Sequence, residues 1–141
     1  MKNLKATVSI CLFYLSLKLL GLFLRLSRSL RQEIYNPDTG FIFNAKYQFE
    51  TRDNKVRLFV VFADGKMSSG FGAVADPDVT ISYRDKATLA RIYAKSPEES
   101  LDYLLTNDMS YTGNISYLMK FSYLSGLLSR RGNYDYRGPE N

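Results

Sequence analysis

Residues 41–65 read FIFNAKYQFETRDNKVRLFVVFADG, and this stretch decides the fold. From Phe41 to Glu50, aromatic or small residues alternate with mostly polar ones, which predicts a strand with one aromatic face. The run Val56–Ala63 is apolar on both faces, as is typical of a strand inside a sheet. Asp64-Gly65 follows at once and is a strong hairpin signal. We therefore expect a sheet in which Val56–Ala63 is central and pairs through this turn with the next strand.

Further segments with strand periodicity are Lys66–Ala73, Val79–Tyr83 and Met109–Thr112. The small residues Ser69, Gly70 and Gly72 predict a bulge or a close backbone contact in the first of these strands. Helical signals mark three segments: one capped by Asp85 and running through Tyr93, one opened by Ser96-Pro97-Glu98-Glu99, and one from Ile115 to Leu128. The sequence predicts an α+β domain with a mostly antiparallel five-stranded sheet.

The first thirty-one residues carry the excess positive charge of the chain. They hold six basic residues and no acidic one, whereas the remainder has thirteen basic and fourteen acidic residues. From Ala6 to Leu24 this segment is apolar apart from Lys18. Positive charge beside an apolar helix indicates a phospholipid surface, whereas a nucleic-acid-binding domain would spread its charge over a folded face. We expect contact with an anionic membrane and none with nucleic acid.

A helical projection of this N-terminal segment gives a leucine-rich cylinder with a narrow polar stripe, formed by Thr7, Lys18, Arg25 and Ser29. The pattern favours a helix that lies in the membrane interface or packs against a partner. The nineteen residues from Ala6 to Leu24 barely reach the length of a membrane span, which is an alternative. No small-x-small cleavage site follows to support a signal peptide. The predicted membrane contacts are Lys18, Phe23, Arg25, Arg28 and Arg31.

Composition excludes several kinds of catalysis. Histidine is absent, which removes Ser-His-Asp and Cys-His arrangements and any histidine base or ligand. The single cysteine, Cys11, lies in the apolar run and is best interpreted as a small apolar residue. Asp76 and Asp78 flank a proline at a strand entrance, where a turn explains both carboxylates. Lys120, between two apolar residues, is the lysine to examine as a nucleophile. We expect no catalytic residue, no metal, no cofactor and no enzymatic activity.

The order of these elements resembles the sterol carrier protein (SCP-like) family. The resemblance is carried by four segments: Phe62-Ala63-Asp64-Gly65, Ala75–Ser82 (ADPDVTIS), Asp85 with Leu89, and Tyr111-Thr112-Gly113-Asn114. It covers about Phe41 to Leu128. It implies a sheet covered by helices around an apolar cavity for a sterol, a fatty-acyl chain or an isoprenoid. It also implies a non-catalytic carrier or accessory module.

The cavity is expected where the apolar faces of the strands meet those of the helices. Its predicted lining is Phe41, Phe43, Val60, Phe62, Phe71, Leu104, Leu105, Leu118, Phe121 and Leu124. We divide the chain into an N-terminal helix (1–35), a lipid-binding domain (41–128) and a polar tail (129–141). The first thirty residues are more apolar than a soluble carrier needs.

Two functional interpretations follow. The first is a cytoplasmic, peripherally membrane-associated lipid binder, with a membrane-associated enzyme as a further partner. The second is an interaction protein of the same fold with a filled core, whose first helix docks on a membrane enzyme complex.

Overall fold

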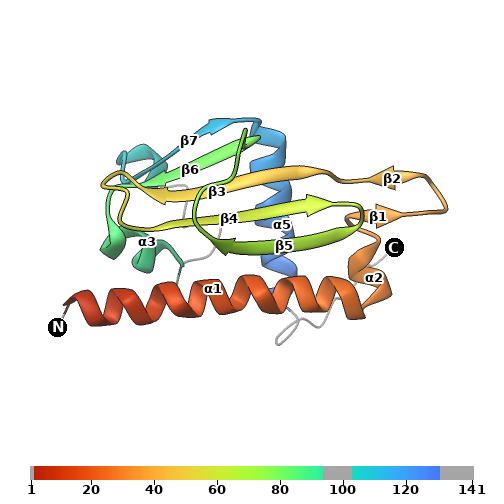
Figure 1. Ribbon diagram of the computed structural model, residues 1–141, viewed down its shortest axis with the longest axis horizontal. Helices are drawn as coiled ribbons and strands as arrows, with labels where there is room; N and C mark the ends of the chain where they lie inside the picture. The colour runs from red at the N-terminus through yellow and green to blue at the C-terminus, as the bar shows by residue number, and fades with distance from the viewer. Residues whose placement is uncertain (1, 94–102, 131–141) are drawn as a thin grey trace, which may run out of the picture.

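The computed structural model describes residues 2–93 and 103–130, with helices packed against one face of a sheet (Figure 1). The elements are α1 (Lys2–Leu26), α2 (Arg28–Arg31), β1 (Tyr35–Asn36), β2 (Phe41–Ile42), β3 (Ala45–Thr51), β4 (Arg57–Ala63), β5 (Lys66–Phe71), β6 (Val79–Tyr83), α3 (Lys86–Tyr93), β7 (Met109–Gly113) and α5 (Ile115–Arg130). The expected helix starting at Ser96 and most of the expected tail lie outside the described residues.

The main sheet has the strand order β5-β4-β3-β6-β7. β4 lies inside the sheet and pairs with β5 through the predicted Asp64-Gly65 turn. The pairs β3–β4, β4–β5 and β6–β7 are antiparallel, whereas β3 and β6 run parallel. The α+β class and the five-stranded sheet are confirmed, and the one parallel pair makes the sheet mixed. It arises because the segment after β5 crosses two strands before β6 begins.

The core lies between one face of this sheet and the helices α1 and α5. The ring of Phe49 on β3 lies 5.6 Å from that of Phe13 on α1 and 5.2 Å from that of Phe121 on α5. Tyr47, two residues earlier on the same strand, is fully buried and also contacts the Phe121 ring, at 5.1 Å. Both helices therefore cover the same face of the sheet and share one apolar core.

α1 buries one side in this core. Ile10, Leu17, Leu20 and Leu24 are buried there together with the strand residues. The helix runs along the sheet beside the edge strand β5 (Figure 1). Its stretch from Leu4 to Leu26 has the length and the mean hydropathy, 2.0, of a membrane span. One side of this helix packs on the sheet of the same chain, and its placement in a membrane interface, across a membrane or on a partner stays a prediction. The division of the chain into residues 1–35, 41–128 and 129–141 stays a prediction.

The opposite face of the sheet is crossed by residues 72–78, which connect β5 to β6. Gln48 of β3 is buried on this face and joins the crossing segment to β4 through hydrogen bonds to both. Its Nε2 donates to the carbonyl oxygens of Leu58 and Gly72, each at 3.0 Å, and its Oε1 accepts from the Val74 N–H at 2.7 Å. Asp78 Oδ2 then accepts from the Lys46 N–H at 2.8 Å, where β6 begins. The parallel strand is held in register by these polar contacts.

The predicted first strand, residues 41–50, is divided in the structure. β2 pairs with β1 in a separate two-stranded sheet, with Tyr35 opposite Ile42 and Asn36 opposite Phe41. Only β3, from Ala45, joins the main sheet. The reason is that the turn at 37–40 folds back on the segment before it, so that the start of the predicted strand pairs locally. Phe41 is consequently exposed.

Two other sequence signals are confirmed in detail. Asp85 caps α3, since its Oδ1 accepts hydrogen bonds from the N–H and the hydroxyl of Thr88, both at 2.8 Å. These bonds hold the pKa of the Asp85 carboxyl below its usual range. At Gly70 the backbone lies close to the Phe59 ring, since a Cβ there would lie 2.7 Å from Cζ of Phe59, while residues 66–71 pair one to one with β4 and form no bulge. Both features help to fix the strands and the helix around the candidate site.

Candidate lipid-binding site and membrane-facing surface

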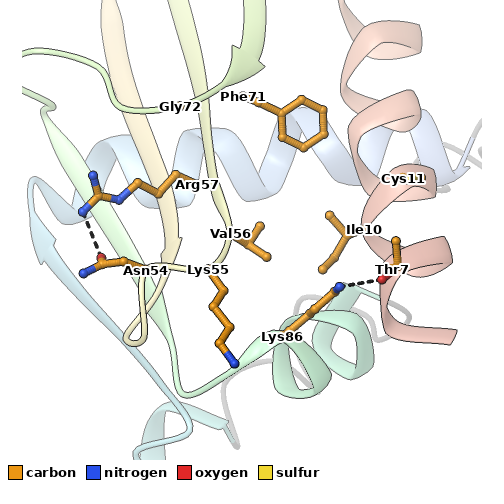
Figure 2. Close-up of a pocket in the computed structure, with 10 residues that line it drawn as sticks. All are labelled: Thr7, Ile10, Cys11, Asn54, Lys55, Val56, Arg57, Phe71, Gly72 and Lys86. Atoms are coloured by element: carbon orange, nitrogen blue, oxygen red, sulfur yellow. Dashed lines mark hydrogen bonds between the residues drawn. The ribbon is translucent and has the colours of Figure 1, made fainter. Parts of the chain in front are cut away.

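A pocket of about 370 Å³ opens between the first half of α1 and the turn that joins β3 to β4 (Figure 2). Ile10 of α1 and Val56 of the turn face each other across it, and Phe71 at the end of β5 closes one side. Ile10 belongs to the core and Val56 packs against it, so the pocket opens onto the core. Its volume is within the range of small-molecule sites.

Three cationic side chains line the same pocket. Lys86 at the start of α3 donates from its ammonium group to the hydroxyl of Thr7 on α1. Arg57 donates to Oδ1 of Asn54 at 2.9 Å, and Lys55 lies between them in sequence (Figure 2). An apolar floor below cationic groups suits a ligand with an apolar chain and a polar or anionic head.

Most of the ten predicted lipid contacts lie elsewhere. Phe71 lines the pocket. Five of the others are buried in the core: Phe43, Val60, Phe62, Phe121 and Leu124. Their rings are packed, since those of Phe43 and Phe62 lie 5.4 Å apart. A lipid would reach these five side chains only by separating the helices from the sheet, so their contact with lipid stays a prediction.

The remaining predicted contacts are less buried. Leu104 and Leu118 are half-buried and pack against the core. Phe41 and Leu105 are exposed, Leu105 to 86%. Leu105 points to solvent because it stands directly before the turn at Thr106 and Asn107, where Asn107 has a φ of 61°. In this structure Leu105 does not face the core, and lipid contact at Leu104, Leu118 and Phe41 stays a prediction.

The outward side of α1 carries an unbroken apolar stripe, which we call the leucine stripe. Its members are spaced alternately four and three residues apart and are each more than 40% exposed: Val8, Leu12, Leu15, Leu19, Leu22 and Leu26. A contiguous apolar surface of this kind is a candidate site of contact with a membrane or another protein. α1 is therefore apolar on two sides, one in the core and one outside.

The predicted membrane contacts lie around this stripe. Arg25, Arg28 and Arg31 are exposed near the end of α1 and in α2, and Phe23 is half-buried. Lys18 is exposed too, but its Nζ donates to the carbonyl oxygen of Ser69 at 2.5 Å on the edge strand. Lys18 thereby covers a backbone group that β5 would otherwise leave unpaired at the edge. Membrane contact by these five residues stays a prediction.

The polar groups weighed as catalytic have structural roles here. Asp78 holds the start of β6 as described, and Asp76 occupies the turn before it with a φ of 50°. Lys120 of α5 pairs with Glu33, at 3.3 Å from Oε2, and lies 5.5 to 5.9 Å from the centres of three aromatic rings. An ammonium group in this position ties α5 to the segment before β1.

The buried tyrosines are not activated nucleophiles. Burial raises the pKa of Tyr47 and of Tyr83, so both phenols stay protonated. The Tyr47 hydroxyl donates to the carbonyl oxygen of Tyr117 at 2.5 Å, which ties β3 to α5. Within residues 2–93 and 103–130, no three acidic, cysteine or histidine side chains come together in a way that could hold a metal ion.

Four of the pocket residues carry no functional signal in the sequence: Ile10, Lys55, Val56 and Lys86. The pocket joins α1, the β3–β4 turn, β5 and α3, and nothing in the sequence shows that these four segments meet. The leucine stripe did leave a readable signal, namely the alternating four- and three-residue spacing within an apolar helix.

A five-stranded sheet with helices on one face and an apolar pocket beside an apolar first helix is the architecture of a small lipid-binding domain. A model of the SCP-2 sterol transfer family matches residues 28–125, more than half of the chain. The chain belongs to this family, and the resemblance found in the sequence is confirmed. A search of curated proteins finds no match.

Solved structures share the fold. A structure described as "UbiJ-SCP2 Ubiquinone synthesis protein" is 17% identical, with a TM-score of 0.56, over 79% of this chain and 86% of that one. The sterol carrier protein domain 2 of Helicoverpa armigera is 18% identical, with a TM-score of 0.51, over 84% of this chain and 87% of that one. At these identities the likeness establishes the fold.

Proposed function

We propose that this protein is a membrane-associated lipid-binding module that acts as a carrier or as an accessory factor. The proposal rests on one observation, which is that α1 contributes both to the pocket and to the exposed apolar surface. Its first half forms one wall of the apolar pocket through Thr7, Ile10 and Cys11, while its outer side bears the leucine stripe. A ligand in the pocket is then held next to the surface that meets the membrane.

The protein acts without catalysis of its own and lies at the cytoplasmic face of a membrane. The alternative is an interaction protein of the same fold that docks on a membrane enzyme complex. The fold shared with a ubiquinone synthesis protein makes isoprenoid lipids one class of ligand to look for. Sterols and fatty-acyl lipids are the other classes.

The ligand is tested by extracting purified protein with organic solvent and identifying the lipids by mass spectrometry. We expect a lipid from the wild type and about tenfold less from Phe71→Gln. Phe71 lines the pocket and stacks on Tyr14 of α1 at 4.4 Å. Replacing an apolar side chain that contacts a ligand removes about 1.5–3 kcal/mol of burial energy, which is at least a factor of ten in affinity.

The matched control is Ile115→Gln, which changes an apolar side chain of similar exposure, 54% against 57% for Phe71, that does not line the pocket. We expect its lipid content to equal that of the wild type, with both variants folded by circular dichroism. A wild-type protein without lipid would favour the interaction-protein alternative. Equal lipid in wild type and Phe71→Gln would rule out this pocket as the site.

Membrane docking is tested with Leu15→Gln in the middle of the leucine stripe. Leu15 is 53% exposed, so the change leaves the core intact. We expect about tenfold weaker binding to anionic vesicles in a sedimentation assay, because the leucine no longer buries its side chain in the lipid. The control is Met119→Gln, which removes an apolar side chain of comparable exposure, 62%, from α5. Equal vesicle binding by Leu15→Gln and Met119→Gln would contradict docking through the leucine stripe.

A further inference from the structure

We propose that a groove between the second half of α1 and the β4–β5 hairpin binds the phosphate of an anionic membrane phospholipid. This inference rests on the membrane docking proposed above and names the lipid group that is recognised. The groove has a volume of about 520 Å³ and is distinct from the pocket at the other end of α1. We call it the basic groove.

The shape of the basic groove comes from the close approach of α1 to the edge of the sheet. The two elements come together at Gly21, where a Cβ would lie in van der Waals contact with the carbonyl oxygen of Met67 on β5, at 3.5 Å. Leu17 and Leu24 of α1 form an apolar part of the lining, and both are buried in the core. One wall of the groove is therefore part of the hydrophobic core.

Four cationic side chains from three elements line the basic groove: Lys18 and Arg25 of α1, Arg31 of α2 and Lys66 of β5. Asp64 is the one acidic residue in the lining, which leaves an excess of three positive charges. Lys18 is engaged with the Ser69 carbonyl. In the part of the chain that the structure describes, no ion pair or side-chain hydrogen bond engages Arg25, Arg31 or Lys66.

Three unengaged cations around one concave site fit a phosphate better than a carboxylate. A phosphate offers several acceptor oxygens, and arginine binds two of them at once through its planar guanidinium group. Like charges held together in this way repel one another, so a bound anion also relieves that repulsion. Charge and shape together indicate a phosphate-bearing ligand.

The leucine stripe indicates that this phosphate belongs to a lipid. Leu22 is a member of the stripe and also lines the basic groove, and Leu26 at the end of the stripe is 72% exposed. When the stripe enters the acyl region of a bilayer, a groove directly beside it lies at the depth of the headgroups. The leucine stripe would contribute no binding free energy to a free phosphate ion.

The test compares two double variants that each remove two positive charges. Arg25→Gln/Lys66→Gln changes the basic groove, and Lys5→Gln/Arg28→Gln changes exposed cations outside it. Binding to phosphatidylcholine vesicles that contain phosphatidylglycerol is measured by sedimentation. We expect the groove variant to bind at least about tenfold more weakly than the control variant, since surface attraction alone weakens both equally.

The outcomes separate this inference from the proposed function. Equal losses in the two variants, with wild-type protein bound to the vesicles, would overturn the basic groove and leave membrane docking intact. A wild-type protein that binds no vesicle would overturn both. Inorganic phosphate, titrated calorimetrically into the wild type, is expected to bind far more weakly than the vesicles. Comparable affinity would overturn the assignment to a lipid.

Discussion

Gly113→Ala is expected to destabilise the protein by about 4 kcal/mol, because two separate costs add at this position. Gly113 has a φ of 108°, a conformation that residues with a Cβ rarely adopt. A Cβ would also lie 2.0 Å from the carbonyl oxygen of Asp78, which belongs to the backbone and cannot turn aside. Strain and overlap contribute about 1–3 kcal/mol each, and together they approach the whole stability of a small domain.

The control for this change is Gly72→Ala. Gly72 has a similar φ of 117°, but no atom lies within 4 Å of the position that the added methyl carbon would take. Gly72→Ala therefore adds the strain without the overlap, and we expect it to cost about half as much. Urea unfolding followed by circular dichroism measures both free energies. Equal values for the two variants would show that the backbone of Asp78 and the end of β7 shift to make room for the added methyl group.

Elements defined by neighbouring residues were predictable from the sequence. The Asp64-Gly65 hairpin and the strand Val79–Tyr83 lie where the pattern places them, as does the cap that Asp85 forms. Each of these depends on local periodicity, turn chemistry or capping, which a few adjacent residues determine. The parallel pairing of β3 with β6 was not predictable, since it depends on how residues 72–78 cross the sheet.

The sequence pattern does not show which side of α1 is buried and which is exposed. Leu17 and Leu20 are buried, while Leu15 and Leu19 beside them in the sequence are exposed. All four are leucine, so hydrophobicity cannot tell the inner side from the outer one. The distinction is made by the sheet, which covers one side of the helix through side chains such as Phe49.

Most of the residues predicted to line a cavity are packed in the core instead. Apolar periodicity identifies the faces that meet, and Phe62 and Phe121 are indeed buried between sheet and helices. Whether such faces enclose a space or fill it depends on the sizes and rotamers of many side chains at once. The described pocket lies at the margin of the core, where Ile10 and Val56 meet three cationic residues.

Gln48→Glu is expected to destabilise the protein by about 3 kcal/mol at pH 7, although the two side chains have nearly the same shape. Gln48 is buried and donates to the carbonyl oxygens of Leu58 and Gly72. A carboxylate cannot donate, so both carbonyls would face a buried negative charge. The Val74 N–H would keep its acceptor. The crossing segment, and with it the parallel strand β6, should loosen first.

The matched control is Glu50→Gln, the reverse change two residues along the same strand and on the same face. Glu50 is half-exposed, and its Oε2 lies 3.8 Å from the Arg57 guanidinium. Losing this ion pair should therefore lower the free energy of unfolding by less than about 1 kcal/mol.

The destabilisation caused by Gln48→Glu should also depend on pH. Burial raises the pKa of a carboxyl introduced there above the unfolded value of about 4.3. The penalty is then small below that pH and grows as the pH rises. Denaturant unfolding at about pH 4 and pH 7 measures this difference, and a penalty independent of pH would contradict a buried carboxylate.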